Sequence, residues 1–167
     1  MVEDFRLLAA VIAAHPDRQV AGRTRLQKTV KLLQSMGLQT RFTYSIHFYG
    51  PYSEDLQACL GLLEKMGLAE EGGRVTAEGE KFYYIEKATP AADTALVHSY
   101  QQQISLMANT PTDILELAAT YQAFCEQGEN SKTALDRLKR KKASKCIGDN
   151  VQKAMQLLKQ LKLQPAA

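Results

Sequence analysis

The segment Phe48-Tyr49-Gly50-Pro51-Tyr52-Ser53-Glu54-Asp55-Leu56 constrains the fold of this chain more than any other. Before it, residues 42–48 alternate large apolar side chains with small polar ones, which is typical of a half-buried strand. Glycine accepts backbone angles that other residues avoid, and proline fixes its own φ. The sequence therefore predicts a strand with Phe42, Tyr44, Ile46 and Phe48 inward, followed by a structural turn at Gly50, Pro51, Tyr52 and Ser53.

The turn leads into a predicted helix over residues 54–66. Ser53 suits the N-cap, and the acidic Glu54 and Asp55 favour the positive end of the helix dipole. We expect its apolar face to consist of Leu56, Cys59, Leu60, Leu63 and Met66. Residues 68–76 then predict a short β-hairpin that turns at Gly72-Gly73, and residues 77–88 predict a further helix capped by Thr76.

The rest of the chain is predicted to be helical. Apolar residues recur at helical spacing over residues 2–14, 23–36, 92–107, 112–127, 131–140 and 149–162. Ala88-Thr89-Pro90 is the best candidate for a boundary. Helix, helix, strand, helix and β-wing is the order of a winged helix-turn-helix. We therefore expect a mostly α fold with a small β component: a winged-helix domain in residues 1–89, and an α-helical extension in residues 90–167 packed on it.

Several segments resemble the uncharacterised YwgA-like bacterial and archaeal proteins. They are Gly22-Arg23-Thr24-Arg25-Leu26-Gln27-Lys28, residues 48–53, Leu62-Leu63-Glu64-Lys65-Met66-Gly67-Leu68, residues 114–120 and residues 150–154. The Leu-Gln-Lys and Gly-Pro-Tyr-Ser signatures are also similar to the Panacea domains, which occur among antitoxins. The resemblance implies a winged-helix fold with a helical extension. It supplies no catalytic residues.

Charge is distributed unevenly along the chain. The formal net charge is +3, residues 1–90 are neutral, and residues 129–167 carry ten basic against three acidic side chains. The N-terminus lacks the basic and apolar regions of a signal peptide, and no apolar run is long enough to span a membrane. Three scattered cysteines form no CxxC pair. We expect a cytoplasmic protein with reduced thiols and no membrane partner.

Two basic regions are candidates for contacts with nucleic acid. Arg23, Arg25, Lys28 and Lys31 belong to the 23–36 helix, where their spacing puts several of them on one side, and Arg74 lies on the predicted wing. The second region comprises Arg137, Lys139, Arg140, Lys141, Lys142 and Lys145. Solvated helix faces are the alternative reading of both regions. No aromatic residue interleaves the second region, so base stacking there is not expected, and we expect Tyr49 and Tyr52 to pack against the core.

The start of the 54–66 helix argues against the usual way in which this fold binds DNA. In winged-helix proteins the first residues of this helix meet the major groove, and phosphate affinity comes from Lys and Arg. Here Glu54 and Asp55 stand at that position, and they favour a simple role at the helix dipole.

No catalytic motif, metal-ligand spacing or cofactor signature is present in the sequence. The chain is therefore expected to be no enzyme and to need no cofactor. The first hypothesis is a DNA-binding transcription regulator from a bacterium or archaeon, with homodimerisation through the helical extension. The alternative is a protein-interaction module of antitoxin type that binds no DNA. The acidic start of the 54–66 helix favours the alternative, and the basic C-terminal region favours the first.

Overall fold

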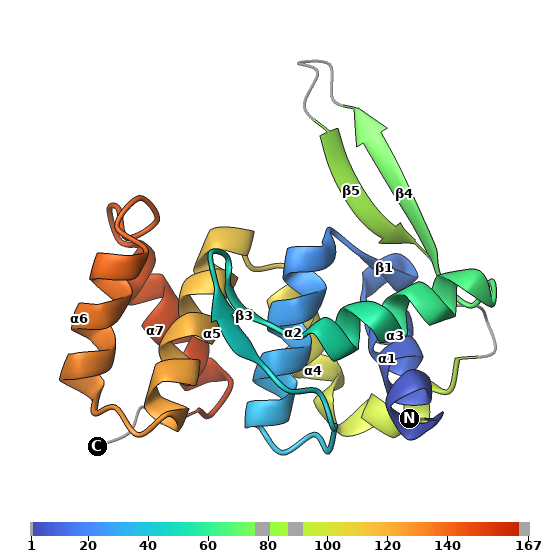
Figure 1. The fold of residues 1–167 in the computed structure, drawn as a ribbon, viewed down its shortest axis with the longest axis horizontal. Helices are drawn as coiled ribbons and strands as arrows, with labels where there is room; N and C mark the ends of the chain where they lie inside the picture. The colour runs from blue at the N-terminus through green and yellow to red at the C-terminus, as the bar shows by residue number, and fades with distance from the viewer. Residues whose placement is uncertain (1, 76–80, 87–91, 164–167) are drawn as a thin grey trace.

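The computed structural model describes residues 2–75, 81–86 and 92–163, and it is mostly helical with two small antiparallel sheets (Figure 1). In chain order the elements are α1 Val2–Ala14, η1 Pro16–Arg18, β1 Gln19–Val20, α2 Arg23–Ser35, β2 Ser45–His47, β3 Gly50–Tyr52, α3 Glu54–Lys65, β4 Glu70–Val75, β5 Lys81–Glu86, η2 Thr94–Tyr100, α4 Gln101–Ala108, α5 Thr112–Glu126, α6 Ser131–Lys141 and α7 Asn150–Gln160.

Three of the four helices predicted in residues 1–89, those over 2–14, 23–36 and 54–66, are confirmed to within a residue at each end. Ser53 is the N-cap of α3, because its side chain accepts a hydrogen bond from the backbone amide of Leu56 at 3.2 Å. Most of the predicted apolar face of α3 is buried. Met66 is the exception: it follows the last helical residue and is 63% exposed.

Residues 81–86, the described part of the helix predicted over 77–88, form the strand β5 instead, the central strand of a three-stranded sheet with the order β1-β5-β4. That prediction was wrong because Phe82-Tyr83-Tyr84-Ile85 is rich in aromatic and β-branched residues and pairs on both edges: Ile85 lies opposite Val20 and Glu71. The turn predicted at Gly72-Gly73 was also wrong, since β4 runs straight through it. Thr76, the predicted cap, and the boundary at residues 88–90 lie outside the described residues.

The second sheet is the small hairpin β2-β3, and its register corrects the predicted turn. His47 pairs with Gly50, Ile46 with Pro51 and Ser45 with Tyr52. Phe48 and Tyr49 are therefore the two turn residues, and Gly50 to Tyr52 form the returning strand. Phe48 was predicted to face inward, but it is 81% exposed because it stands on the turn rather than in the strand.

The C-terminal half packs around α5, which is buried over nearly its whole length. In Figure 1, α2 and β3 flank one side of α5, while α6 and α7 lie beyond it, far from the β4-β5 hairpin. The single helix predicted for residues 92–107 divides into η2 and α4, in which Val97, Ile104 and Met107 are fully buried. One continuous apolar core joins residues from both halves of the chain.

Gly50 is required by a close approach between β3 and α5. Its φ is +87°, and a Cβ at this position would collide with Thr120 Oγ1. We expect Gly50→Ala to lower the free energy of unfolding by about 1–3 kcal/mol, from backbone strain and the clash together. Urea denaturation measures this change.

Gly61→Ala is the matched control. Gly61 lies within α3, and a Cβ there would have no heavy atom within 4 Å. Alanine has the higher helix propensity, so this variant should be more stable by about 0.5–1 kcal/mol. Equal effects of the two substitutions would contradict the close approach.

Candidate functional site

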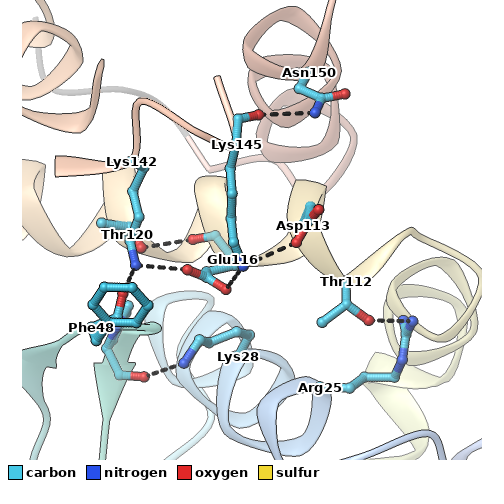
Figure 2. Close-up of polar contacts among 11 residues, drawn as sticks. Arg25, Lys28, Phe48, Thr112, Asp113, Glu116, Thr120, Lys142, Lys145 and Asn150 are labelled. Carbon is cyan, nitrogen blue, oxygen red and sulfur yellow. Dashed lines mark hydrogen bonds and ion pairs between the residues drawn. The ribbon is translucent and has the colours of Figure 1, made fainter. Parts of the chain in front are cut away.

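The two signature segments noted in the sequence lie against each other in space. Gln27 on α2 makes two hydrogen bonds with the backbone of Ser53: its Nε2 donates to the carbonyl at 2.9 Å, and its Oε1 accepts from the amide at 2.9 Å. Next to it, Lys28 Nζ donates to the carbonyl of Pro51 at 2.8 Å (Figure 2). The Leu-Gln-Lys and Gly-Pro-Tyr-Ser signatures therefore form one unit, in which α2 holds the strand β3.

A buried carboxylate completes this unit from the C-terminal half. Glu116 on α5 is 0% exposed and accepts from Lys142 Nζ and from Lys145 Nζ, each at 2.6 Å (Figure 2). Lys145 also pairs with Asp113 at 3.0 Å. Lys142 Nζ further donates to the carbonyl of Phe48. We call Lys28, Lys142, Lys145, Glu116 and Asp113 the lysine–carboxylate cluster.

The electrostatics of the cluster differ from one lysine to the next. Burial lowers the pKa of Lys28 to about 8; Glu116 opposes this shift, and Lys142 and Lys145 add to it. Burial also acts to lower the pKa of Lys145, but its hydrogen bonds to Glu116 and Asp113 outweigh that effect and raise it. The cluster has three lysines but two carboxylates. Lys142 and Lys145 pair with carboxylates, and Lys28 donates to a backbone carbonyl, because a buried ammonium group needs a partner.

The basic residues of α2 do not form the exposed face that their spacing predicts. Arg25 is buried and donates to the carbonyls of Met107 and Thr110, both at 2.7 Å. Lys31 is buried and pairs with Glu126, while Arg23 pairs with Glu71 at 2.5 Å. Lys28 belongs to the lysine–carboxylate cluster. Three of the four residues are thus buried against acceptors from segments far away in the sequence, whereas Arg23 is exposed. Phosphate binding by α2 stays a prediction.

The basic residues of the C-terminal region divide into two groups. Lys142 and Lys145 point into the cluster, and Arg137 pairs with Glu129 and lies 4.0 Å from the centre of the Phe124 ring. Six further basic side chains are exposed and form no ion pair within the described residues: Lys132, Lys139, Arg140, Lys141, Lys159 and Lys162. The side chain of Arg74 lies outside the part of the structure that is described.

Sequence reasoning missed the aromatic pair beside this basic region. Phe48 and Tyr49, which we call the aromatic tip, are 81% and 58% exposed. Lys142 Nζ lies 5.6 Å from the Phe48 ring centre, and Lys145 Nζ lies 5.6 Å from that of Tyr49. The expectation that Tyr49 packs on the core was wrong; Tyr52 is half-buried against the His47 ring. No sequence signal links residue 48 to residue 142, because the chain returns to this point only through α5 and α6.

No group of three or more His, Cys, Asp or Glu side chains is placed to hold a metal among residues 2–75, 81–86 and 92–163. His15 is buried, and its Nδ1 forms a hydrogen bond with the carbonyl of Val11 at 2.7 Å. Burial lowers the pKa of His15 to about 4. Burial raises the pKa of the Cys59 thiol to about 11, which makes it a poor nucleophile. None of the described helices is long and apolar enough to cross a membrane.

Comparison with known proteins gave one informative relative. The chain is 26% identical over 151 residues to "Uncharacterized protein YwgA" from Bacillus subtilis (strain 168), and the match covers 86% of this chain and 89% of that protein. The chain is thus similar to a YwgA protein over most of its length. No model of a known protein family matches it. No solved structure gives a significant match.

Removing the buried carboxylate tests the cluster. Glu116→Gln leaves Lys142 and Lys145 buried without their main counter-charge, so we expect a loss of about 3–5 kcal/mol in the free energy of unfolding. Asp149→Asn is the control, because the Asp149–Lys153 pair is more than half exposed on both sides. It should cost under about 1 kcal/mol. A small effect of Glu116→Gln in chemical denaturation would contradict the cluster.

Lys28 predicts a specific pH dependence of stability. Its pKa is about 8 in the folded protein, below the ordinary 10.5. Between these two values the unfolded chain binds more protons, so stability should rise with pH. We therefore expect the free energy of unfolding of the wild type to rise by up to about 3 kcal/mol relative to that of Lys28→Met as the pH increases through this window.

Denaturation of both proteins at several pH values measures this difference, in which the other lysines cancel. Lys132→Met removes an exposed lysine and should follow the wild type at every pH. A constant difference between wild type and Lys28→Met would show that Lys28 titrates normally.

Proposed function

We propose that this chain is a winged-helix protein that binds nucleic acid through its C-terminal region. The order α1-β1-α2-α3-β4-β5 and the sheet order β1-β5-β4 support the winged-helix assignment. In that arrangement α2 and α3 form the helix pair, and β4-β5 is the wing. The wing projects away from the helices in Figure 1.

The usual DNA-reading surface of this fold is unfavourable here. Exposed Glu54 and Asp55 open α3, where they repel phosphates. The basic side chains of α2 donate to buried acceptors or pair with Glu126 or Glu71, so this helix offers little free positive charge. Phosphate contacts must therefore come from another surface.

One observation carries the proposal: most of the exposed cations without an ion pair in the described chain lie in α6, in α7 or directly after α7. Residues 129–167 have ten basic and three acidic side chains, and six of the bases are exposed without an ion pair in the described chain. Lys139, Arg140 and Lys141 form a continuous run at the end of α6. Such a cluster neutralises phosphates and gives the strong salt dependence of nucleic-acid binding.

Protein binding is a second candidate, and α3 favours it. Leu62 is 46% exposed and lines an apolar hollow of about 330 Å³ together with Phe5, Phe42 and Cys59. Acidic Asp4 and Asp55 border the hollow. Apolar surface rimmed by charge is typical of a protein-binding site. A single partner co-purifying with the chain, and lost on Leu62→Glu, would support this candidate.

Fluorescence anisotropy with labelled DNA at several salt concentrations tests nucleic-acid binding. The double variant Lys139→Gln/Lys141→Gln should bind more weakly and should reduce the slope of log affinity against log salt by about 2. The double variant Arg6→Gln/Lys65→Gln removes the same charge from exposed positions in α1 and α3. It should leave the slope unchanged. Absence of binding at low salt would overturn the proposal, and so would equal effects of the two double variants.

A further inference from the structure

The aromatic tip stands out as exposed apolar surface that the fold does not need. Phe48 and Tyr49 form an edge-to-face pair with ring centres 5.0 Å apart. Directly after them Gly50 and Pro51 are buried, so the hairpin packs tightly on α5 and α2 up to its turn. Two adjacent large rings in solvent are unusual at a turn, where small polar residues are the rule.

The backbone beneath the rings is held firmly. The carbonyl of Phe48 accepts from Lys142, the carbonyl of Pro51 from Lys28, and Ser53 pairs twice with Gln27. These donors come from α2 and from the end of α6, so the hairpin is fixed on two sides (Figure 2). A preorganised ring platform loses little conformational entropy when it binds a flat ligand.

The free cations of α6 lie close to the platform along the chain. Lys139, Arg140 and Lys141 form the last turn of α6, and the next residue, the C-cap Lys142, reaches the Phe48 carbonyl. Lys142 and Lys145 themselves are neutralised by Glu116 and Asp113, and their amines lie over the Phe48 and Tyr49 rings, each 5.6 Å from the ring centre. The tip therefore combines exposed ring faces with neighbouring cations that remain available.

We propose that the aromatic tip stacks on an unpaired base, so that the preferred ligand is single-stranded nucleic acid. This inference rests on the proposed function, which supplies the phosphate contacts from α6 and α7. Exposed aromatic side chains beside a basic surface are the usual platform for single strands, since every base has a ring face and each stacked base contributes about 1–3 kcal/mol. In an intact duplex the base faces are already stacked, which leaves the tip with no partner.

Binding of labelled oligothymidine, oligouridine and a mixed-sequence duplex measures this preference. The double variant Phe48→Leu/Tyr49→Leu keeps apolar bulk but removes the ring faces. It should weaken single-strand binding by roughly five-fold or more and leave duplex binding unchanged. Lys139→Gln/Lys141→Gln should weaken both. The oligonucleotide that binds with the higher affinity, oligothymidine or oligouridine, assigns the ligand as DNA or RNA. Circular dichroism checks that each variant folds.

A spectroscopic readout comes from the absence of tryptophan in this chain. Tyr49→Trp places a single indole on the tip, and stacking on a base should quench its emission when an oligonucleotide is added, but not when the duplex is added. Met66→Trp is the control, because that exposed position lies at the end of α3. Its emission should not respond.

The outcomes separate the two proposals. The stacking inference is overturned if Phe48→Leu/Tyr49→Leu binds single strands as tightly as the wild type and the emission of Tyr49→Trp is not quenched. The proposed function is then unaffected. Absence of binding to oligonucleotides and to duplex alike overturns both.

Discussion

The contact of Glu116 with Lys142 and Lys145, together with the Lys145–Asp113 pair, joins α5 to the segment that follows α6. Glu116 lies in the first half of α5, Lys142 is the C-cap of α6, and Lys142 also reaches the hairpin at Phe48. Lys28 binds the same hairpin from α2. This buried carboxylate therefore links α5 to the lysine that also holds the β2-β3 hairpin at the aromatic tip.

Stability alone does not explain such a cluster. A buried ion pair is often no more stabilising than well-packed apolar side chains of the same volume, because both charges lose their hydration. What the cluster supplies is geometry: a lysine amine that reaches a particular carbonyl fixes the register of a hairpin whose strands have three residues each. An isolated hairpin of that size is marginal in water. Held from α2 and α6, it becomes a rigid projection.

The helices could be predicted from the sequence because their apolar period is local information. Leu56, Leu60 and Leu63 share a face whatever else the chain does. The strand β5 was missed because a short apolar run such as Phe82-Tyr83-Tyr84-Ile85 fits a helix or a strand. Its pairing with β4, and with Val20 more than sixty residues earlier, decides for the strand. The same limit applies to the site. Lys28 looks like a surface lysine until β3 and α5 enclose it, and the aromatic tip meets the basic region only in three dimensions.

The distribution of charge gives the two candidate functions separate surfaces. The acidic start of α3 and the apolar hollow at Leu62 belong to the N-terminal half, whereas the free bases belong to α6 and α7. Figure 1 places α1 and α3 at one end of the molecule and α6 and α7 at the other. A protein on α3 and a nucleic acid on α6 would therefore not compete for the same residues. The lysine–carboxylate cluster joins α2, the hairpin, α5 and α6 in one contact network, and one apolar core runs through both halves of the chain, so the two surfaces belong to elements that are in contact through the described residues.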